Sequence, residues 1–148
     1  MSHTTTLLDV AIRDMDALNK AVAELAARGI RARLVTNTKP RMYSSNQHGV
    51  CPYVLRLEDS PYDVGFDVSA DGSLTPVFDS WQGHIHKQIG SRRHAGGRVQ
   101  GAQADIGLLM QTYAKHAAVN AAVAQGYVVE NTQFDDQGNI HLTIANVA

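Results

Sequence analysis

The chain has 148 residues, of which 44% are hydrophobic and 18% are charged, and its formal net charge is -1. This composition excludes disorder along the whole chain, and the length is typical of one domain, so we expect a single globular domain over residues 1–148. The net charge excludes a global field that would attract nucleic acid or a membrane surface. One cysteine, Cys51, excludes an internal disulfide.

The sequence shows no pattern of export or membrane insertion. The first twelve residues lack a basic start, and Asp9 interrupts their apolar run, so they do not resemble a signal peptide. Nothing approaches the roughly 18 consecutive apolar residues of a membrane span. We therefore expect a soluble, cytoplasmic protein that makes no contact with a membrane.

The first forty residues predict a β-α-β unit. Residues 4–12 are rich in threonine and β-branched side chains, which favours a strand. Asp14 can then cap a helix that Gly29 ends. The apolar stripe of this helix consists of Leu18, Ala21, Val22 and Leu25. Apolar residues alternate with Arg31 and Arg33 over residues 30–34, which predicts a second strand.

The rest of the chain predicts a β-meander, a helix and a hairpin. Residues 37–50 form a long loop, and alternating apolar residues then predict strands over 53–58, 64–68 and 74–78. Residues 102–125 have helical apolar spacing, and Gly126 ends that helix. Strands over 127–134 and 140–147 are joined by a turn that contains Gly138.

The predicted fold class is therefore α+β, with the order β-α-β-β-β-β-α-β-β. We expect one mainly antiparallel sheet with two helices on one face, because this arrangement buries every apolar face against a single core. The connection through the first helix should be right-handed if the two strands that flank it are parallel.

Several segments together resemble a known family. They are residues 1–3 (MSH), 62–66 (YDVGF), 71–72 (DG), 77–81 (VFDSW), 111–114 (QTYA), 126–127 (GY) and 138–142 (GNIHL). In this order they resemble the hypothetical chloroplast reading frame thirty-five family, a domain found in plastids, cyanobacteria, other bacteria and bacteriophages. The resemblance covers nearly the whole chain, but the segment after Trp81 departs from the family pattern.

This resemblance implies no reaction, because the family has no established activity. Bacterial and phage members tend to be encoded beside a MoxR-like or other AAA-type ATPase. The resemblance therefore implies a non-enzymatic accessory or adaptor protein that binds a protein partner such as an AAA-type ATPase. The sequence shows no P-loop, dinucleotide fingerprint or nucleophile elbow, so we expect no cofactor and favour a protein without catalytic activity.

A basic, glycine-rich segment over residues 82–101 gives the alternative function. It has no acidic residue, and its cations are Lys87, Arg92, Arg93 and Arg98. Glycine-rich backbone and arginine side chains can approach phosphates closely, so this loop could form a phosphate- or nucleic-acid-binding module. The segment between Glu58 and Asp79, just before it, contains acidic residues but no lysine or arginine. The other interpretation is therefore a solvated loop whose positive charges balance this acidic segment, since charged surface loops are common and exposed ion pairs contribute little to stability.

Three further groups of residues could have a chemical role, and each also has a simpler structural interpretation. Asp79, His84, His86 and His94 could ligate a metal, although their spacing matches no compact signature and surface histidines are the simpler interpretation. Asp63 and Asp67 could bind a cation or serve as a general-acid/base pair, but they are four residues apart, and the period of two of a strand predicts that they share its solvent face. Cys51 would need a nearby histidine to become a nucleophile, and otherwise it is a small, half-buried apolar side chain. We therefore predict no metal site.

Overall fold

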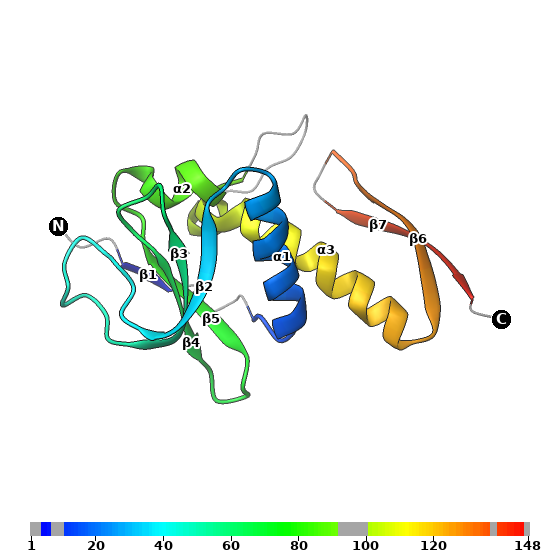
Figure 1. Cartoon of the computed structure of the whole chain (residues 1–148), viewed down its shortest axis with the longest axis horizontal. Coiled ribbons are helices and arrows are strands. Elements are labelled where there is room, and N and C mark those ends of the chain that lie inside the picture. The colour runs from blue at the N-terminus through cyan, green and yellow to red at the C-terminus, as the bar shows by residue number, and fades with distance from the viewer. Residues whose placement is uncertain (1–3, 7–10, 92–100, 137–138, 147–148) are drawn as a thin grey trace.

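The computed structural model describes residues 4–6, 11–91, 101–136 and 139–146 (Figure 1). The strands are β1 (Thr4–Thr6), β2 (Ala32–Thr38), β3 (Cys51–Leu57), β4 (Val64–Val68), β5 (Leu74–Asp79), β6 (Tyr127–Phe134) and β7 (Ile140–Asn146). The helices are α1 (Met15–Ala27), α2 (His84–Ile89) and α3 (Gly107–Ala124), with short 3-10 helices η1 (Trp81–Gly83) and η2 (Gly101–Ile106). The α+β class with antiparallel strands is confirmed.

Five strands form one antiparallel sheet in the order β1-β5-β4-β3-β2. The meander from β2 to β5 places sequence neighbours side by side, and β1 joins its far edge by pairing Thr5 with Phe78. The predicted first strand is described only at Thr4–Thr6 and at a bridge between Ile12 and Leu74, and residues 7–10 lie outside the described residues. Strands β1 and β2 are thus parallel to each other at opposite edges of this sheet.

The main core lies between the sheet and the helices. Its fully buried side chains come from α1 (Leu18, Leu25), from the sheet (Leu55, Phe66, Phe78) and from the later helices (Ile85, Ile89, Leu109). A second, smaller cluster contains Cys51, Val54 and Val77. The start of α1 is fixed as the sequence predicts, because Asp14 Oδ1 accepts a hydrogen bond from the backbone N–H of Ala17 at 2.9 Å.

The prediction of two helices is wrong, because a third helix, α2, lies within the segment that we predicted to be a loop. Ile85 and Ile89 are four residues apart and fully buried, so they give the segment a helical apolar stripe. Gly83 lies at the start of this helix with φ of 68°, a left-handed value that favours glycine. Glycines therefore flank a helix at this point, and they do not make the whole segment irregular.

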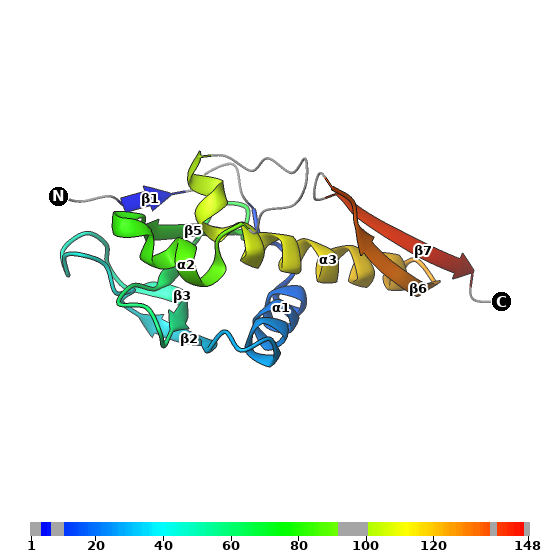
Figure 2. The same ribbon diagram turned by 90° about the horizontal axis from the view of Figure 1, so that it is seen from above.

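The prediction of a single sheet is also wrong, because β6 and β7 form a separate two-stranded sheet. Helix α3 has 18 residues and spans about 27 Å. Its first half packs into the core, where Leu108, Leu109, Thr112 and Tyr113 are buried. The next turn still contacts the core through Ala117 and α1 through Asn120. Its second half carries the hairpin away from the five-stranded sheet, as Figures 1 and 2 show. We call residues 114–146 the arm.

None of the helices among the described residues has both the length and the apolar character that a membrane crossing needs.

Candidate functional site

The predicted anion-binding residues are described only in part. Lys87 lies on α2 with an exposed side chain. Arg92, Arg93 and Arg98 lie outside the described residues. Binding of phosphate or nucleic acid by this segment stays a prediction.

Among the described residues that we considered as metal ligands, the structure does not bring together Asp79, His84 and His86. The ring of His84 packs edge-on against Tyr62, with 5.1 Å between the ring centroids. His86 Nδ1 lies 3.0 Å from Asp105 Oδ1. Asp79 is buried and accepts a hydrogen bond from the backbone N–H of Tyr43 at 2.9 Å. His94 lies outside the described residues.

Asp63 is fully buried, so the interpretation of this residue as part of a solvent face is wrong. Its carboxylate lies 2.8 Å from Arg41 Nη2 and 3.1 Å from Arg56 Nε. It also accepts the backbone N–H of Arg41 at 2.9 Å, while the backbone N–H of Asp63 donates to the carbonyl of Arg41 at 3.0 Å. Arg41 from the loop over residues 39–50 and Arg56 from β3 supply the partners that make this burial possible.

Two buried carboxylates hold that long loop against the sheet. Asp63 binds the loop at Arg41, and Asp79 binds it two residues later at the backbone N–H of Tyr43. Asp79 also accepts a hydrogen bond from Gln47 Nε2 at 2.9 Å. These bonds are charge-assisted and partly buried, so they fix the path of the backbone that leads to His48.

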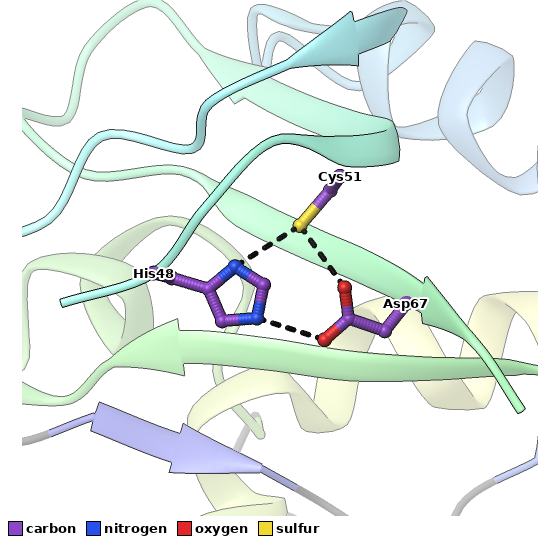
Figure 3. A group of neighbouring side chains, drawn as sticks. All are labelled: His48, Cys51 and Asp67. Atoms are coloured by element: carbon purple, nitrogen blue, oxygen red, sulfur yellow. Dashed lines mark hydrogen bonds and ion pairs between the residues drawn. The ribbon is translucent and has the colours of Figure 1, made fainter. Parts of the chain in front are cut away.

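At the end of this loop, His48 meets Cys51 and Asp67 (Figure 3). Cys51 Sγ donates to Asp67 Oδ1 at 3.4 Å and lies 3.6 Å from His48 Nδ1. His48 Nε2 lies 2.8 Å from Asp67 Oδ2. One ligand atom from each residue can be chosen so that all three lie within 4.8 Å of one another. Among the described residues this is the group of histidine, cysteine and acidic side chains whose spacing suits a metal ion.

Without a metal, this cluster does not activate the thiol. Burial, followed by the charge of Asp67 and the hydrogen bond to it, raises the pKa of Cys51 to about 12. The thiolate is the nucleophilic form, and it is therefore nearly absent at neutral pH. Although a histidine and a carboxylate lie beside the cysteine, the arrangement does not resemble a nucleophilic site.

The arm presents a second candidate surface. Residues 117–124 (AAVNAAVA) carry no charge, although none of them is buried. Ala117 lies against the core and Asn120 bonds to α1, and the residues after them extend beyond these contacts. The register of β6 and β7 places a set of mostly apolar residues on one face of the hairpin: Tyr127, Val129, Phe134, Ile140, Leu142 and Ile144. Phe134 is 38% exposed on that face and Ile144 is 43% exposed.

The sequence contained a signal for the cluster that our interpretation of Cys51 missed. His48 precedes Cys51 by three residues at the point where the loop enters β3. Strand β4 follows as the partner of β3, and the pairing of Tyr53 with Phe66 brings Asp67 to the start of β3. The meander was predicted, so this proximity could have been inferred from a correct register.

Comparisons with models of protein families, with curated proteins and with solved structures gave no match.

Proposed function

We propose that this protein is a cytoplasmic, non-enzymatic accessory protein that binds a partner protein through the arm. One observation carries the proposal. Of the described residues between Ala114 and Asn146, none is buried, although many are apolar. The arm therefore has apolar surface that its own fold leaves exposed to water.

The second half of α3 supports this proposal. A helix on the surface of a protein normally has a polar outer face, whereas one that is apolar all round is usually buried. Residues 117–124 include Asn120 as their sole polar side chain, and Val123 is exposed. A partner that packs on this segment would remove the exposed valine and alanine surface from water, and the small alanine side chains would allow a close approach.

The hairpin supplies two further binding elements. Helix α3 contacts both strands, yet Phe134 and Ile144 on the apolar face remain partly exposed. In the described part of the chain, β6 and β7 pair only with each other, so each has an outer edge of unpaired backbone groups. An extended segment of a partner could add to either edge, and its side chains could contact the apolar face.

We propose an AAA-type ATPase as the partner, and the support for this choice is the family resemblance of the sequence. The experiment uses the purified full chain and the AAA-type ATPase encoded nearest to its gene, with binding measured by sedimentation velocity. Ile144→Glu places a charge on the apolar face and should weaken the complex roughly 30-fold, as expected for the loss of one anchor worth about 2 kcal/mol.

The matched control is Thr143→Glu, because Thr143 precedes Ile144 in β7 and lies on the opposite face of the hairpin. It should leave the affinity nearly unchanged, and far-UV circular dichroism should show that both variants fold. Equal binding by Ile144→Glu and the wild type would contradict the role of the arm. A chain that does not bind the ATPase but forms a dimer sensitive to Ile144→Glu would show that the partner is wrong and that the arm mediates self-association.

A further inference from the structure

We propose that His48, Cys51 and Asp67 bind a divalent transition-metal ion, and that zinc is the ion this donor set suits best. The proposal does not depend on the proposed function, because the three residues lie at the five-stranded sheet and not in the arm.

The chemistry of the donors selects the metal. The cluster offers an imidazole nitrogen, a sulfur and a carboxylate oxygen. Calcium and magnesium prefer oxygen ligands alone, whereas zinc accepts nitrogen, sulfur and oxygen together. Three protein ligands leave one of the four positions of a tetrahedral ion for water. His48 and Asp67 have side chains that are 23% and 41% exposed, so solvent can reach that position.

The spacing of the donors agrees with tetrahedral coordination. Zinc bonds of about 2.3 Å to sulfur and about 2.0–2.2 Å to nitrogen and oxygen separate two ligand atoms by about 3.4–3.6 Å. Cys51 Sγ lies 3.6 Å from His48 Nδ1 and 3.4 Å from Asp67 Oδ1. Both separations that involve the sulfur therefore already have the values that a bound ion requires.

The backbone around the cluster is held in place, which limits the cost of ordering the ligands. Cys51 and Asp67 lie in the paired strands β3 and β4, and the buried carboxylates of Asp63 and Asp79 fix the loop that carries His48. Gly65 leaves space for the thiol, since a Cβ at this position would lie 2.7 Å from Cys51 Sγ.

Binding requires three local changes. His48 Nδ1 lies 3.0 Å from the carbonyl oxygen of Gly49, and this contact must open so that the lone pair of Nδ1 can face the ion. The carboxylate of Asp67 cannot ligate the ion through Oδ1 and also keep Oδ2 on the far nitrogen of the same imidazole ring. The 2.8 Å contact between His48 Nε2 and Asp67 Oδ2 must therefore open. The S–H bond of Cys51 breaks, its electron pair forms the bond to the metal, and the proton leaves to the solvent. No oxidant or reductant is needed.

Cobalt(II) serves as the probe, because it occupies zinc sites and its absorption reports the ligands. The full chain, without a histidine tag and stripped of metal, is titrated with cobalt(II). One equivalent should produce a thiolate-to-cobalt charge-transfer band, together with the visible bands of a tetrahedral ion, and zinc should then displace it. Cys51→Ser should abolish the charge-transfer band. His48→Ala and Asp67→Asn should each weaken binding by more than the roughly 10- to 100-fold expected for a residue that only orients a ligand.

The matched control is His141→Ala. His141 Nε2 lies 3.0 Å from Asp135 Oδ2, so this pair has a similar histidine–carboxylate contact at a site that has no cysteine. The control should bind cobalt as the wild type does, and thermal unfolding without metal should show that each variant folds. Failure of the wild type to produce the charge-transfer band would overturn the proposal, as would binding that Cys51→Ser, His48→Ala and Asp67→Asn leave unchanged.

Discussion

Replacing Asp63 by asparagine removes the buried negative charge that joins the long loop to the sheet. The carboxylate contacts Arg41 Nη2 at 2.8 Å and Arg56 Nε at 3.1 Å, and it accepts the backbone N–H of Arg41 at 2.9 Å. Asparagine keeps one oxygen acceptor, but its amide group presents N–H donors to arginine groups that also only donate. Both arginines then lose the counter-charge that they contact directly, and only the longer-range charge of Glu58 remains.

The magnitude follows from the burial of the three groups. A hydrogen bond to a charged group contributes about 1.5–3 kcal/mol, and removal of one partner of a buried ion pair costs about 3–5 kcal/mol. Asp63 is fully buried, but the side chains of Arg41 and Arg56 are 39% and 24% exposed and can turn partly toward water. We therefore expect Asp63→Asn to lower the free energy of unfolding by about 2–4 kcal/mol, which lowers Tm by about 5–15 °C.

Urea and thermal unfolding followed by circular dichroism measure this change. Asp59→Asn is the matched control, because Asp59 pairs with Arg31 on the exposed edge of the same sheet. Exposed pairs contribute little, so this variant should unfold close to the wild type. If Asp63→Asn and Asp59→Asn both have the same midpoint as the wild type, the buried carboxylate of Asp63 does not hold the loop and the reasoning fails.

Two other substitutions test the remaining electrostatic and hydrogen-bonding features. The hydroxyl of Tyr113 accepts the backbone N–H groups of Arg13 and Asp14 at 3.0 and 3.1 Å, so Tyr113→Phe should cost about 1–2 kcal/mol in urea unfolding. An unchanged midpoint of urea unfolding for Tyr113→Phe would contradict this contribution of the hydroxyl group. Hydrogen bonds from the side chain and backbone of Ser73, then the contact with Arg13, lower the pKa of Asp71 from 3.8 to about 2. A carboxyl group whose pKa is lower in the folded state stabilises the fold at pH values above its pKa in the unfolded chain. This contribution disappears as the pH falls through the pKa of the folded state. The stability difference between the wild type and Asp71→Asn should therefore shrink as the pH falls from 3.8 toward 2, and a constant difference would contradict this assignment.

Local features of the fold were predictable because neighbouring residues determine them. Asp14 caps α1 as expected, and Gly29, with φ of 93°, lies just after the helix. The meander and the C-terminal hairpin follow from alternating apolar residues and short connections. In each case the signal is local: the cap joins residues three positions apart, and only a few residues separate β3 from β4, β4 from β5 and β6 from β7.

The features that the sequence did not reveal depend on contacts between distant residues. Asp63 and Asp67 have the same periodicity, yet Asp63 is buried because Arg41, 22 residues earlier, returns to pair with it. The contact of His48 with Asp67 likewise joins residues 19 positions apart. Helix α2 was missed because glycines flank a stripe of only two buried isoleucines, and so short a stripe is a weak signal.

The lack of buried side chains in the arm has a consequence for local unfolding. Segments with few buried apolar contacts open at a smaller free-energy cost than the core, so their amide protons exchange with solvent sooner. The arm can therefore open while the five-stranded sheet, with Phe66 and Phe78 fully enclosed, stays folded. A partner that covers the arm adds the contacts that this segment lacks, and it should slow exchange at residues 114–146 far more than in the sheet.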